Sequence, residues 1–443
     1  MGCSDDVNDT LDDATSETQQ TALLTITVPE SYKPAEGDFF FITTAEGKLL
    51  GSTEISGTQS TITTTEDITD QRLVMHRFLK NASRFWLRSW MDWPAGMEIE
   101  WAREKAQAGK LLGFTNVSFK DIPKHDQFYL SPTGQYFPAA TNDKITYRVE
   151  VFENFNEAYA MTSDGNQGSY KLLKDLSLDK DYRISLAEMN SDMQKLSIDL
   201  EGMEAEYAQI WATQNYSSLI KQILFEQLYL SGEQPGEVNA FVPTNLTAYP
   251  YQKSYIVATD PSKKGLSHAY RTYGFIDQQF KKINAQINSY ATGISDLKME
   301  ASGTFDQTTI RITNVSHSSD THIRRIWRIV SPDGKGMPFP SLPDALASKF
   351  PGFNQDALVN EENGFYLIDF ELGDNSLHDN YEMFIADFAT PPSQTPFTTT
   401  NYRQLYDSRE KNGRVSKKDQ KKQRSLTGYT GNPDPSLATD VFY

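Results

Sequence analysis

The chain has 443 residues, of which 38% are hydrophobic and 12% aromatic, and its formal net charge is −17 at pH 7. This length predicts two to four domains, and the apolar content is sufficient for packed cores, which excludes a chain disordered over most of its length. The net charge of −17 argues against basic, phosphate-binding patches over most of the chain, so we expect no nucleic-acid partner. No stretch approaches the roughly 18 apolar residues of a membrane-spanning helix, so attachment to a membrane requires a lipid.

The first segment, residues 1–22, contains the single cysteine of the chain, Cys3, in acidic and polar surroundings. A lone cysteine cannot close an internal disulfide, and a structural cysteine is normally buried in an apolar run. Two kinds of lipidation are considered: myristoylation of Gly2, whose motif has Ser or Thr where this chain has Asp6, and acylation of Cys3 in a bacterial lipoprotein. We predict that Cys3 is lipidated and that the segment forms a lipid anchor and a flexible acidic tether. The alternative is an incidental cysteine in a flexible terminus.

Acidic residues follow the cysteine almost directly, and this pattern is similar to a known signal. The sequence Cys3-Ser4-Asp5-Asp6 resembles the export signal of surface-exposed outer-membrane lipoproteins of Bacteroidota. This resemblance implies a protein of the outer membrane that is lipid-anchored and faces the cell exterior. One acyl chain alone holds a protein only marginally, whereas the triacylated cysteine of a bacterial lipoprotein holds it firmly.

Residues 23–160 are predicted to form an N-terminal β-sandwich. Apolar residues alternate with threonines after residue 23, and two apolar runs flank the Glu46-Gly47 pair, which indicates a hairpin. No helical period occurs in the first part of this segment, so an antiparallel β-sandwich is the simplest prediction. Residues 39–51 resemble the hairpin of carboxypeptidase-regulatory-like modules.

Four of the six tryptophans fall within residues 84–101, in a segment that we predict to begin as a strand. Alternate residues of a strand share a face, so Leu87 and Met91 are expected in the core. The other face combines guanidinium and indole groups. With the nearby Trp93 it forms our candidate binding surface, which consists of Arg84, Trp86, Arg88, Trp90 and Trp93. Three interpretations stay open: a structural cation–π ladder, a protein-docking surface, and a platform for sugar rings.

Residues 161–294 are predicted to form a middle β-rich domain. Strict alternation favours strands at residues 182–186 and 196–200, although the spacing of Met and Leu around them also fits a helix. Residues 187–232 are therefore left open between strand and helix, with a preference for strands in their first part. Residues 275–294 are expected to form a helix that lies on the sheets.

Residues 295–390 are predicted to form a C-terminal β-sandwich. Alternation predicts a hairpin over residues 308–330 and closing strands at residues 365–370 and 381–388. Asp344 is the expected N-cap of a short helix. The whole chain is thus predicted to be mainly β, with two or three antiparallel sandwich modules of immunoglobulin-like or transthyretin-like type and few short helices.

Residues 391–443 are predicted to form an extended basic tail. Between residues 403 and 424, nine basic and three acidic residues give a net charge of +6 in an otherwise acidic chain. The candidate docking residues of this tail are Lys411, Arg414, Lys417, Lys418, Lys421, Lys422 and Arg424. The tail is either simply solvated, or it contacts an acidic partner surface or the phosphates of lipopolysaccharide.

No nucleophile elbow, zinc-protease motif, P-loop or dinucleotide fingerprint occurs in the sequence, so we expect no cofactor, no metal and no enzymatic activity. The cysteine start, the module around residues 47–51 and the segment from Trp327 to Pro343 together resemble Bacteroidota surface lipoproteins. We therefore expect a non-catalytic surface lipoprotein that acts as an accessory or docking subunit of an outer-membrane complex for transport, secretion or barrel assembly. Its expected partner is an outer-membrane β-barrel protein. A glycan-binding surface lipoprotein is the alternative, and a hydrolase with an unrecognised site is a third hypothesis.

Overall fold

The computed structural model shows a mainly β chain, which confirms the predicted fold class; the division into sandwich modules stays a prediction. The described part of the chain contains 26 strands and three α-helices. The structure describes residues 20–28, 30, 37–101, 110–121, 127–131, 135–138, 144–153, 156–178, 180–213, 222–229, 236–245, 247–263, 266–317, 322–360, 364–389 and 400–411.

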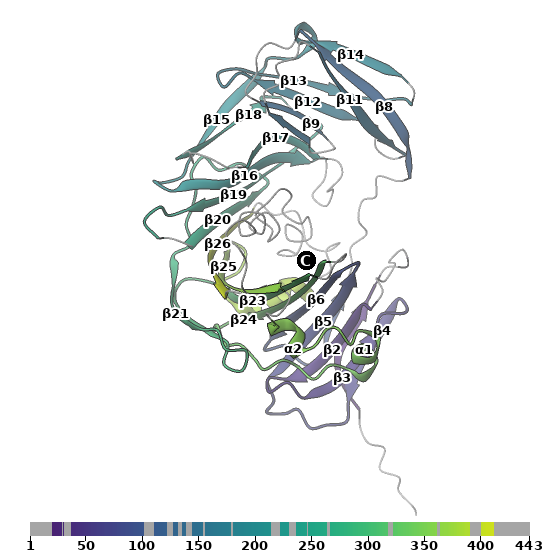
Figure 1. Cartoon of the computed structure of the whole chain (residues 1–443), viewed down its shortest axis with the longest axis vertical. Coiled ribbons are helices and arrows are strands. Elements are labelled where there is room, and N and C mark those ends of the chain that lie inside the picture. Colours follow the sequence, from purple (N-terminus) through teal and green to yellow (C-terminus); the bar gives the residue numbers. More distant parts are fainter. Residues whose placement is uncertain are drawn as a thin grey trace, which may run out of the picture.

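A twelve-stranded sheet forms the body of the protein, and its strands follow a curve in Figure 1. In spatial order the strands are β17 (Gln222–Tyr229), β16 (Glu204–Thr213), β19 (Tyr251–Thr259), β20 (Leu266–Tyr273), β26 (Thr400–Lys411), β25 (Gly364–Asn375), β23 (Gln307–His317), β24 (His322–Ser331), β6 (Arg84–Met91), β5 (Leu73–Asn81), β2 (Phe39–Thr44) and β3 (Leu49–Glu54). Neighbouring strands are antiparallel, except that β24 and β6 are parallel. This parallel pair joins the N-terminal strands to the strands from the rest of the chain.

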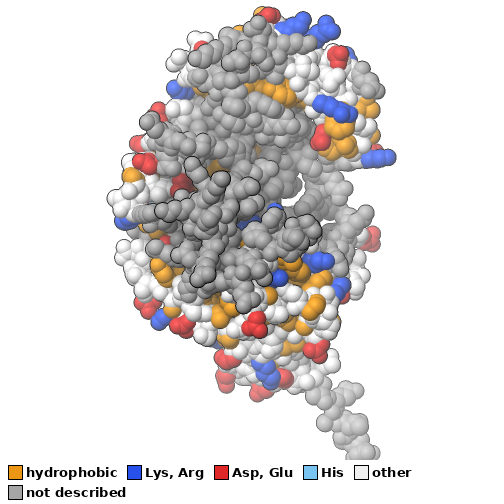
Figure 2. Space-filling view, viewed as in Figure 1, with side chains coloured by type: hydrophobic (Ala, Val, Ile, Leu, Met, Phe, Trp, Pro, Cys, Tyr) orange, Lys and Arg blue, Asp and Glu red, His pale blue; other side chains and the backbone are white. Residues whose placement is uncertain are grey.

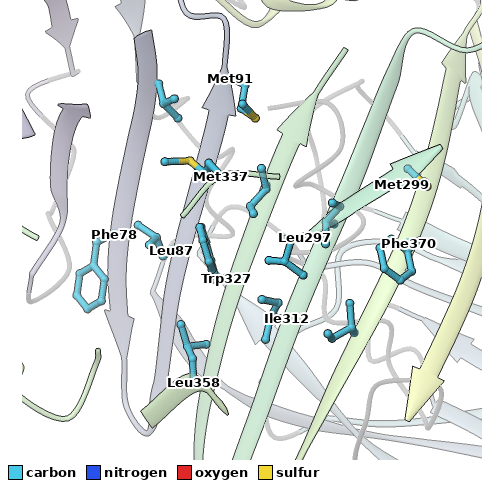
Figure 3. Packing of buried hydrophobic residues seen from close by; sticks show 14 of the residues in the cluster. Phe78, Leu87, Met91, Leu297, Met299, Ile312, Trp327, Met337, Leu358 and Phe370 are labelled. Carbon is cyan, nitrogen blue, oxygen red and sulfur yellow. The ribbon is translucent and has the colours of Figure 1, made fainter. Parts of the chain in front are cut away.

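One face of the central strands packs against the hairpin of β21 (Ala285–Ala291) and β22 (Lys298–Gly303) and against the helices α1 (Asp344–Lys349) and α2 (Gln355–Val359). Figure 3 shows this core, in which Trp327 of β24 lies between Leu87 of β6 and Ile312 of β23. Trp327 is fully buried, at 0% exposure. The aliphatic and aromatic side chains expected from strand alternation therefore meet across segments far apart in the sequence.

The opposite face of the N-terminal strands packs against a three-stranded sheet with the order β4 (Gln59–Thr64), β1 (Thr21–Thr27) and β7 (Met97–Glu100). Successive side chains of β5 point to opposite faces and so contribute to both cores. Val74 packs in the core with Trp327, and Met75 packs in the core beneath the sheet of β4, β1 and β7. The helix α3 (Tyr381–Ala389) also covers the second core, and its Tyr381 hydroxyl donates a 2.9 Å hydrogen bond to the carbonyl oxygen of Met91.

The remaining strands lie at the top of Figure 1. One sheet has the order β10 (Gln135–Pro138), β9 (Gln127–Ser131), β12 (Ala158–Ser163) and β13 (Gly168–Leu173). A second has the order β11 (Lys144–Phe152), β8 (Leu111–Lys120) and β14 (Asp181–Ser185), which a 3-10 turn (Leu186–Glu188) follows. These two sheets share a core around Phe119 and Phe128. The paired strands β15 (Met193–Asp199) and β18 (Glu237–Pro243) contribute to another core, together with β16, β19 and β20.

Several sequence-based predictions of individual elements are confirmed. The hairpin of β2 and β3 turns at Gly47, whose φ of +86° is the left-handed conformation that glycine adopts without strain. The hairpin of β23 and β24 spans the predicted segment, and the short helix begins at Asp344, with Pro343 rather than Asp344 at the N-cap. In the segment left open, β15, β16 and β17 are strands.

Three predictions are wrong. Residues 381–388 form α3 rather than a strand, because Tyr381 and Ile385, four residues apart, share the buried face of a helix. Residues 275–294 contain no helix; β21 occupies their last part and pairs with β22. The predicted tail contains β26, which lies between β20 and β25 in the centre of the large sheet. Strands from the two predicted sandwiches and from the predicted middle domain all lie in this same sheet.

Candidate functional site

The central strands turn a polar face away from the apolar core. On β23, for example, Ile310 and Ile312 lie in the core, whereas Thr309 and Arg311 alternate with them and point to the opposite side. The β21 hairpin covers the apolar side on the outside of the curve in Figure 1, so this opposite side is the inner one. We call it the polar face; its members are Arg77, Arg84, Trp86, Arg88, Arg324, Arg328, Gln307, Thr309, Arg311, Asp369, Glu371, Tyr402, Gln404, Tyr406, Arg271, Tyr273, Tyr255 and Lys253.

Four arginines of the polar face lie in one row across four adjacent strands. Arg77 on β5 pairs in register with Arg88 on β6, which pairs with Arg328 on β24. Arg328 in turn pairs with Arg311 on β23. Adjacent strands are about 4.8 Å apart, and like charges directly opposite each other destabilise a sheet. The arginine row therefore requires counter-charges that the fold supplies.

Two of the arginines at the ends of the row form ion pairs with buried carboxylates. The Arg77 guanidinium donates to both carboxylate oxygens of Asp38, at 2.9 and 3.1 Å. At the other end, Arg311 Nε donates to Asp369 Oδ2 at 2.7 Å. Asp38 is 0% and Asp369 3% exposed, so both pairs are largely shielded from water and hold their guanidinium groups in fixed directions.

The two inner arginines lie near a carboxylate and an indole ring. Arg328 Nη2 lies 3.6 Å from Glu371 Oε2, and the Arg88 guanidinium carbon lies 5.4 Å from the ring centroid of Trp90. The Arg88–Trp90 contact is a cation–π interaction within the β6 strand and fits the structural interpretation of the alternating Arg and Trp pattern.

Beside the row, a hydrogen-bonded network crosses β23, β25 and β26. Gln307 Nε2 donates to the Tyr402 hydroxyl at 2.7 Å, and this hydroxyl lies 3.5 Å from Glu371 Oε1. Gln404 donates to the same Glu371 oxygen and accepts a hydrogen bond from the Tyr406 hydroxyl. Burial and the Glu371 carboxylate raise the pKa of Tyr402, so its hydroxyl stays protonated and serves as a donor.

Gly373 makes room for this network. It lies on the polar side of β25, where a Cβ atom would come within 2.2 Å of the Tyr402 hydroxyl and 3.0 Å of Gln307 Nε2. Any larger residue at this position would displace both partners of the hydrogen bond. The absence of a side chain at Gly373 therefore follows from the position of Tyr402.

Arg271 on β20 lies beside this network, in register with Tyr402 of β26, and is 5% exposed. Its guanidinium carbon lies 4.2 Å from the ring centroid of Tyr255. Burial alone would lower the pKa of Arg271, but the hydroxyl oxygens of Tyr255, Tyr406 and Tyr273 raise it. In the described part of the chain, neither Nε nor Nη1 of Arg271 has a hydrogen-bond partner.

The predicted surface of Arg84, Trp86, Arg88, Trp90 and Trp93 is divided by the fold. Arg84 is exposed, and Trp86 and Arg88 are half-buried. Trp90 and Trp93 are each 2% exposed, because the sheet of β1, β4 and β7 covers this end of β6. A continuous surface of all five side chains is therefore wrong, and only the end with Arg84, Trp86 and Arg88 is accessible.

The other predicted functional residues lie mainly outside the described residues. This applies to Cys3 and, in the basic tail, to Arg414, Lys417, Lys418, Lys421, Lys422 and Arg424. Lys411 is the last residue of β26. Their proposed roles stay predictions.

One serine–histidine contact is present, but it lies in the core. Ser89 Oγ is 2.8 Å from His76 Nδ1, and both residues are 0% exposed. Burial lowers the pKa of His76 to about 3, so the imidazole is neutral at physiological pH. A substrate cannot reach a fully buried pair, so its role is structural.

Arg271, Tyr402, Gln404 and Glu371 were not predicted from the sequence. On β26, polar residues occupy both sides and hide the alternation that would have marked Tyr402 and Gln404. Within the described ranges, no three His, Cys, Asp or Glu side chains are grouped so as to hold a metal ion. The helices of the same ranges include none with the length and hydropathy needed to cross a membrane.

Comparison with known proteins does not assign the chain to a family. No protein-family model matches its sequence, and no curated protein shows significant similarity to it. The polar face is therefore interpreted from its geometry and chemistry.

Proposed function

We propose that this chain is a non-catalytic lipoprotein of the outer-membrane surface that serves as an accessory or docking subunit of a membrane protein complex. The Cys3-Ser4-Asp5-Asp6 start supports the lipid anchor and the outward location. The arginine row is the observation that carries the docking role, because buried carboxylates hold its outer guanidinium groups while Arg88 of the row lies on the same side of β6 as the exposed Arg84. Elsewhere on the described surface seen in Figure 2, acidic and basic side chains are interspersed.

Arginine is suited to this role. Its planar guanidinium recognises carboxylates through paired hydrogen bonds, and its apolar stem packs on neighbouring side chains. Arg84, Trp86 and Arg88 at the accessible end of β6 offer both kinds of contact. We infer that an acidic surface of an outer-membrane β-barrel protein docks here, since charge complementarity steers and orients such contacts.

The test is affinity purification of the tagged protein from native outer membranes, with mass spectrometry of the partners and of Cys3. We expect a diacylglycerol-modified Cys3 and a membrane protein that co-purifies. The double variant Arg84→Glu/Arg88→Glu should lose the partner, whereas Lys298→Glu/Lys335→Glu should retain it, because these exposed lysines lie by the β22 strand on the opposite side of the sheet. Equal recovery with both variants would refute docking at this face.

A second candidate function is glycan binding. The stacking of Arg271 on Tyr255 and the half-buried indole of Trp86 place flat apolar rings beside hydrogen-bonding groups, which is how proteins hold sugar rings. A glycan array separates the two functions: binding to glycans by the purified protein, without any membrane protein in the native preparation, favours this second candidate.

A further inference from the structure

Among the described residues whose charge acts on the Tyr402 hydroxyl, two are arginines and one is a carboxylate. Arg271 and Arg328 both lie close enough to the Tyr402 hydroxyl to oppose the increase of its pKa, and Glu371 is the carboxylate that acts in the other direction. Arg271 is 5% and Arg328 9% exposed. Within the described ranges, these two buried guanidinium groups and one carboxylate, which lies 3.6 Å from Arg328 Nη2, leave an excess of positive charge where water does not stabilise it.

The same region contains unsatisfied hydrogen-bonding groups of both kinds. Among the described residues, no acceptor lies within hydrogen-bonding distance of Arg271 Nε, Arg271 Nη1 or Arg328 Nε. The amide oxygen of Gln307, at 3% exposure, likewise has no donor in the described ranges. Buried polar groups are rarely left unpaired in folded proteins, so this combination indicates the position of a ligand.

The chemistry of these groups selects the ligand. The guanidinium N–H groups are donors that a carboxylate can accept from, whereas the Gln307 oxygen is an acceptor that a hydroxyl group can donate to. The rings of Tyr255 and Tyr406, both half-buried, lie near Arg271. A chain of acidic sugars offers all three features: carboxylates, hydroxyls and flat ring faces. A poly-glutamate peptide offers the carboxylates alone.

We propose that the Arg271–Tyr402–Arg328 region of the polar face binds an acidic glycan through the carboxylates of its uronic-acid residues. Arg271 and Arg328 bind carboxylates, Gln307 accepts a hydrogen bond from a sugar hydroxyl, and Tyr255 and Tyr406 contact the ring faces. The inference rests on the second candidate function and names its substrate class. It does not depend on docking of a protein at Arg84 and Arg88.

The test is calorimetric titration of the full-length protein with three probes: an oligogalacturonate, a neutral galactan oligomer of equal length, and a poly-glutamate peptide. We expect the oligogalacturonate to bind at least 10-fold more tightly than the other two and to raise the thermal unfolding midpoint of the wild-type protein. Equal binding of the neutral oligomer, equal binding of poly-glutamate, or no binding of the oligogalacturonate would each overturn the proposal.

The variants Arg271→Met and Arg328→Met should each weaken oligogalacturonate binding about 10- to 100-fold, since each removes a charge-assisted contact. Arg271→Met should leave the unfolding midpoint of the unliganded protein nearly unchanged, because the lost contact with Tyr255 is offset by the removal of Nε and Nη1, which lack partners in the described ranges. Arg72→Met, which breaks an exposed ion pair with Asp92, is the matched control and should bind normally. Unchanged affinity in both site variants would also overturn the proposal.

The two functional hypotheses fail separately. If the protein co-purifies with a membrane partner but none of the site variants affects glycan binding, the glycan site is refuted and docking stands. If oligogalacturonate binds as described but no membrane partner is recovered, the docking role is refuted and the glycan site stands.

Discussion

The indole Nε1 of Trp327 donates a 3.0 Å hydrogen bond to Ser89 Oγ and so connects two residues 238 positions apart in the chain. The bond crosses the parallel pair of β24 and β6, the junction between the N-terminal strands and the rest of the sheet. Ser89 Oγ also contacts His76 Nδ1, and His76 Nε2 contacts Thr43 Oγ1, each at 2.8 Å. Because Thr43 donates its own proton to the Thr44 carbonyl, it accepts from Nε2, and Nδ1 accepts from Ser89.

Ser89→Ala should destabilise the fold by about 2–4 kcal/mol, because it leaves Trp327 Nε1 and His76 Nδ1 unpaired in the core. Urea unfolding monitored by tryptophan fluorescence measures the change. Ser289→Ala is the control: this serine is exposed and bonds only to Glu300 within the described ranges, so the loss should stay below about 0.5 kcal/mol. Equal losses would contradict the role of the buried chain of hydrogen bonds.

The buried imidazole of His76 predicts a loss of stability in acid. Its pKa is lowered from 6.5 to about 3 by burial, so between these two values the unfolded chain takes up a proton that the folded protein does not. The stabilising contribution is thus present above pH 6.5 and lost as the pH falls towards 3, at up to about 1.4 kcal/mol per pH unit.

The variant His76→Gln isolates this effect. The difference in unfolding free energy between wild type and variant, measured in urea at pH 7.5, 5.5 and 4.5, should shrink as the pH falls. A difference that does not change with pH would show that His76 does not titrate as the structure predicts.

Trp90 and Trp86, two residues apart on β6, should respond differently to replacement. Trp90→Ala should lower the free energy of unfolding by about 3–5 kcal/mol, because it opens a cavity in the core beneath the sheet of β4, β1 and β7. Trp86→Ala should cost about 1 kcal/mol or less and should instead weaken binding of the partner or glycan. Calorimetric melting together with the binding assay separates the two roles. A Trp86→Ala variant that loses stability without losing binding would reduce Trp86 to a structural residue.

Gly373→Ala should disrupt the hydrogen bond between Gln307 and Tyr402. The added Cβ would push the Tyr402 hydroxyl away, so we expect a stability loss of about 1–3 kcal/mol and weaker oligogalacturonate binding. Gly57→Ala introduces the same methyl group where no atom lies within 4 Å and is the control. Unaltered stability and binding in Gly373→Ala would show that Tyr402 is not held in this position.

Local alternation was sufficient to predict many elements. On β6 it placed Leu87 and Met91 in the core, and the Glu46-Gly47 pair between two apolar runs placed the turn between β2 and β3. These predictions succeed because the two faces of each strand meet different environments close by in the sequence.

The pairing of strands that are distant in the sequence could not be predicted in this way. No local pattern indicates that β6 pairs with β24 or that β26 lies between β20 and β25, and the arginine row exists only through these pairings. For α3, aromatic and aliphatic residues suggested a strand, but the decisive feature is the contact of Tyr381 with Met91, almost 300 residues earlier. A site whose residues are far apart in the sequence can therefore be recognised only once the three-dimensional structure is known.

The most direct test of the account is site-specific photo-crosslinking in intact cells. A photoreactive amino acid at position 86, on the accessible end of the polar face, should crosslink to an outer-membrane component, whereas the same amino acid at Thr61, exposed on β4, should not. Crosslinks at position 86 that match those at position 61, or a protein recovered from the cytosol without a lipid, would contradict the claim that this face is the binding surface of an outer-membrane lipoprotein.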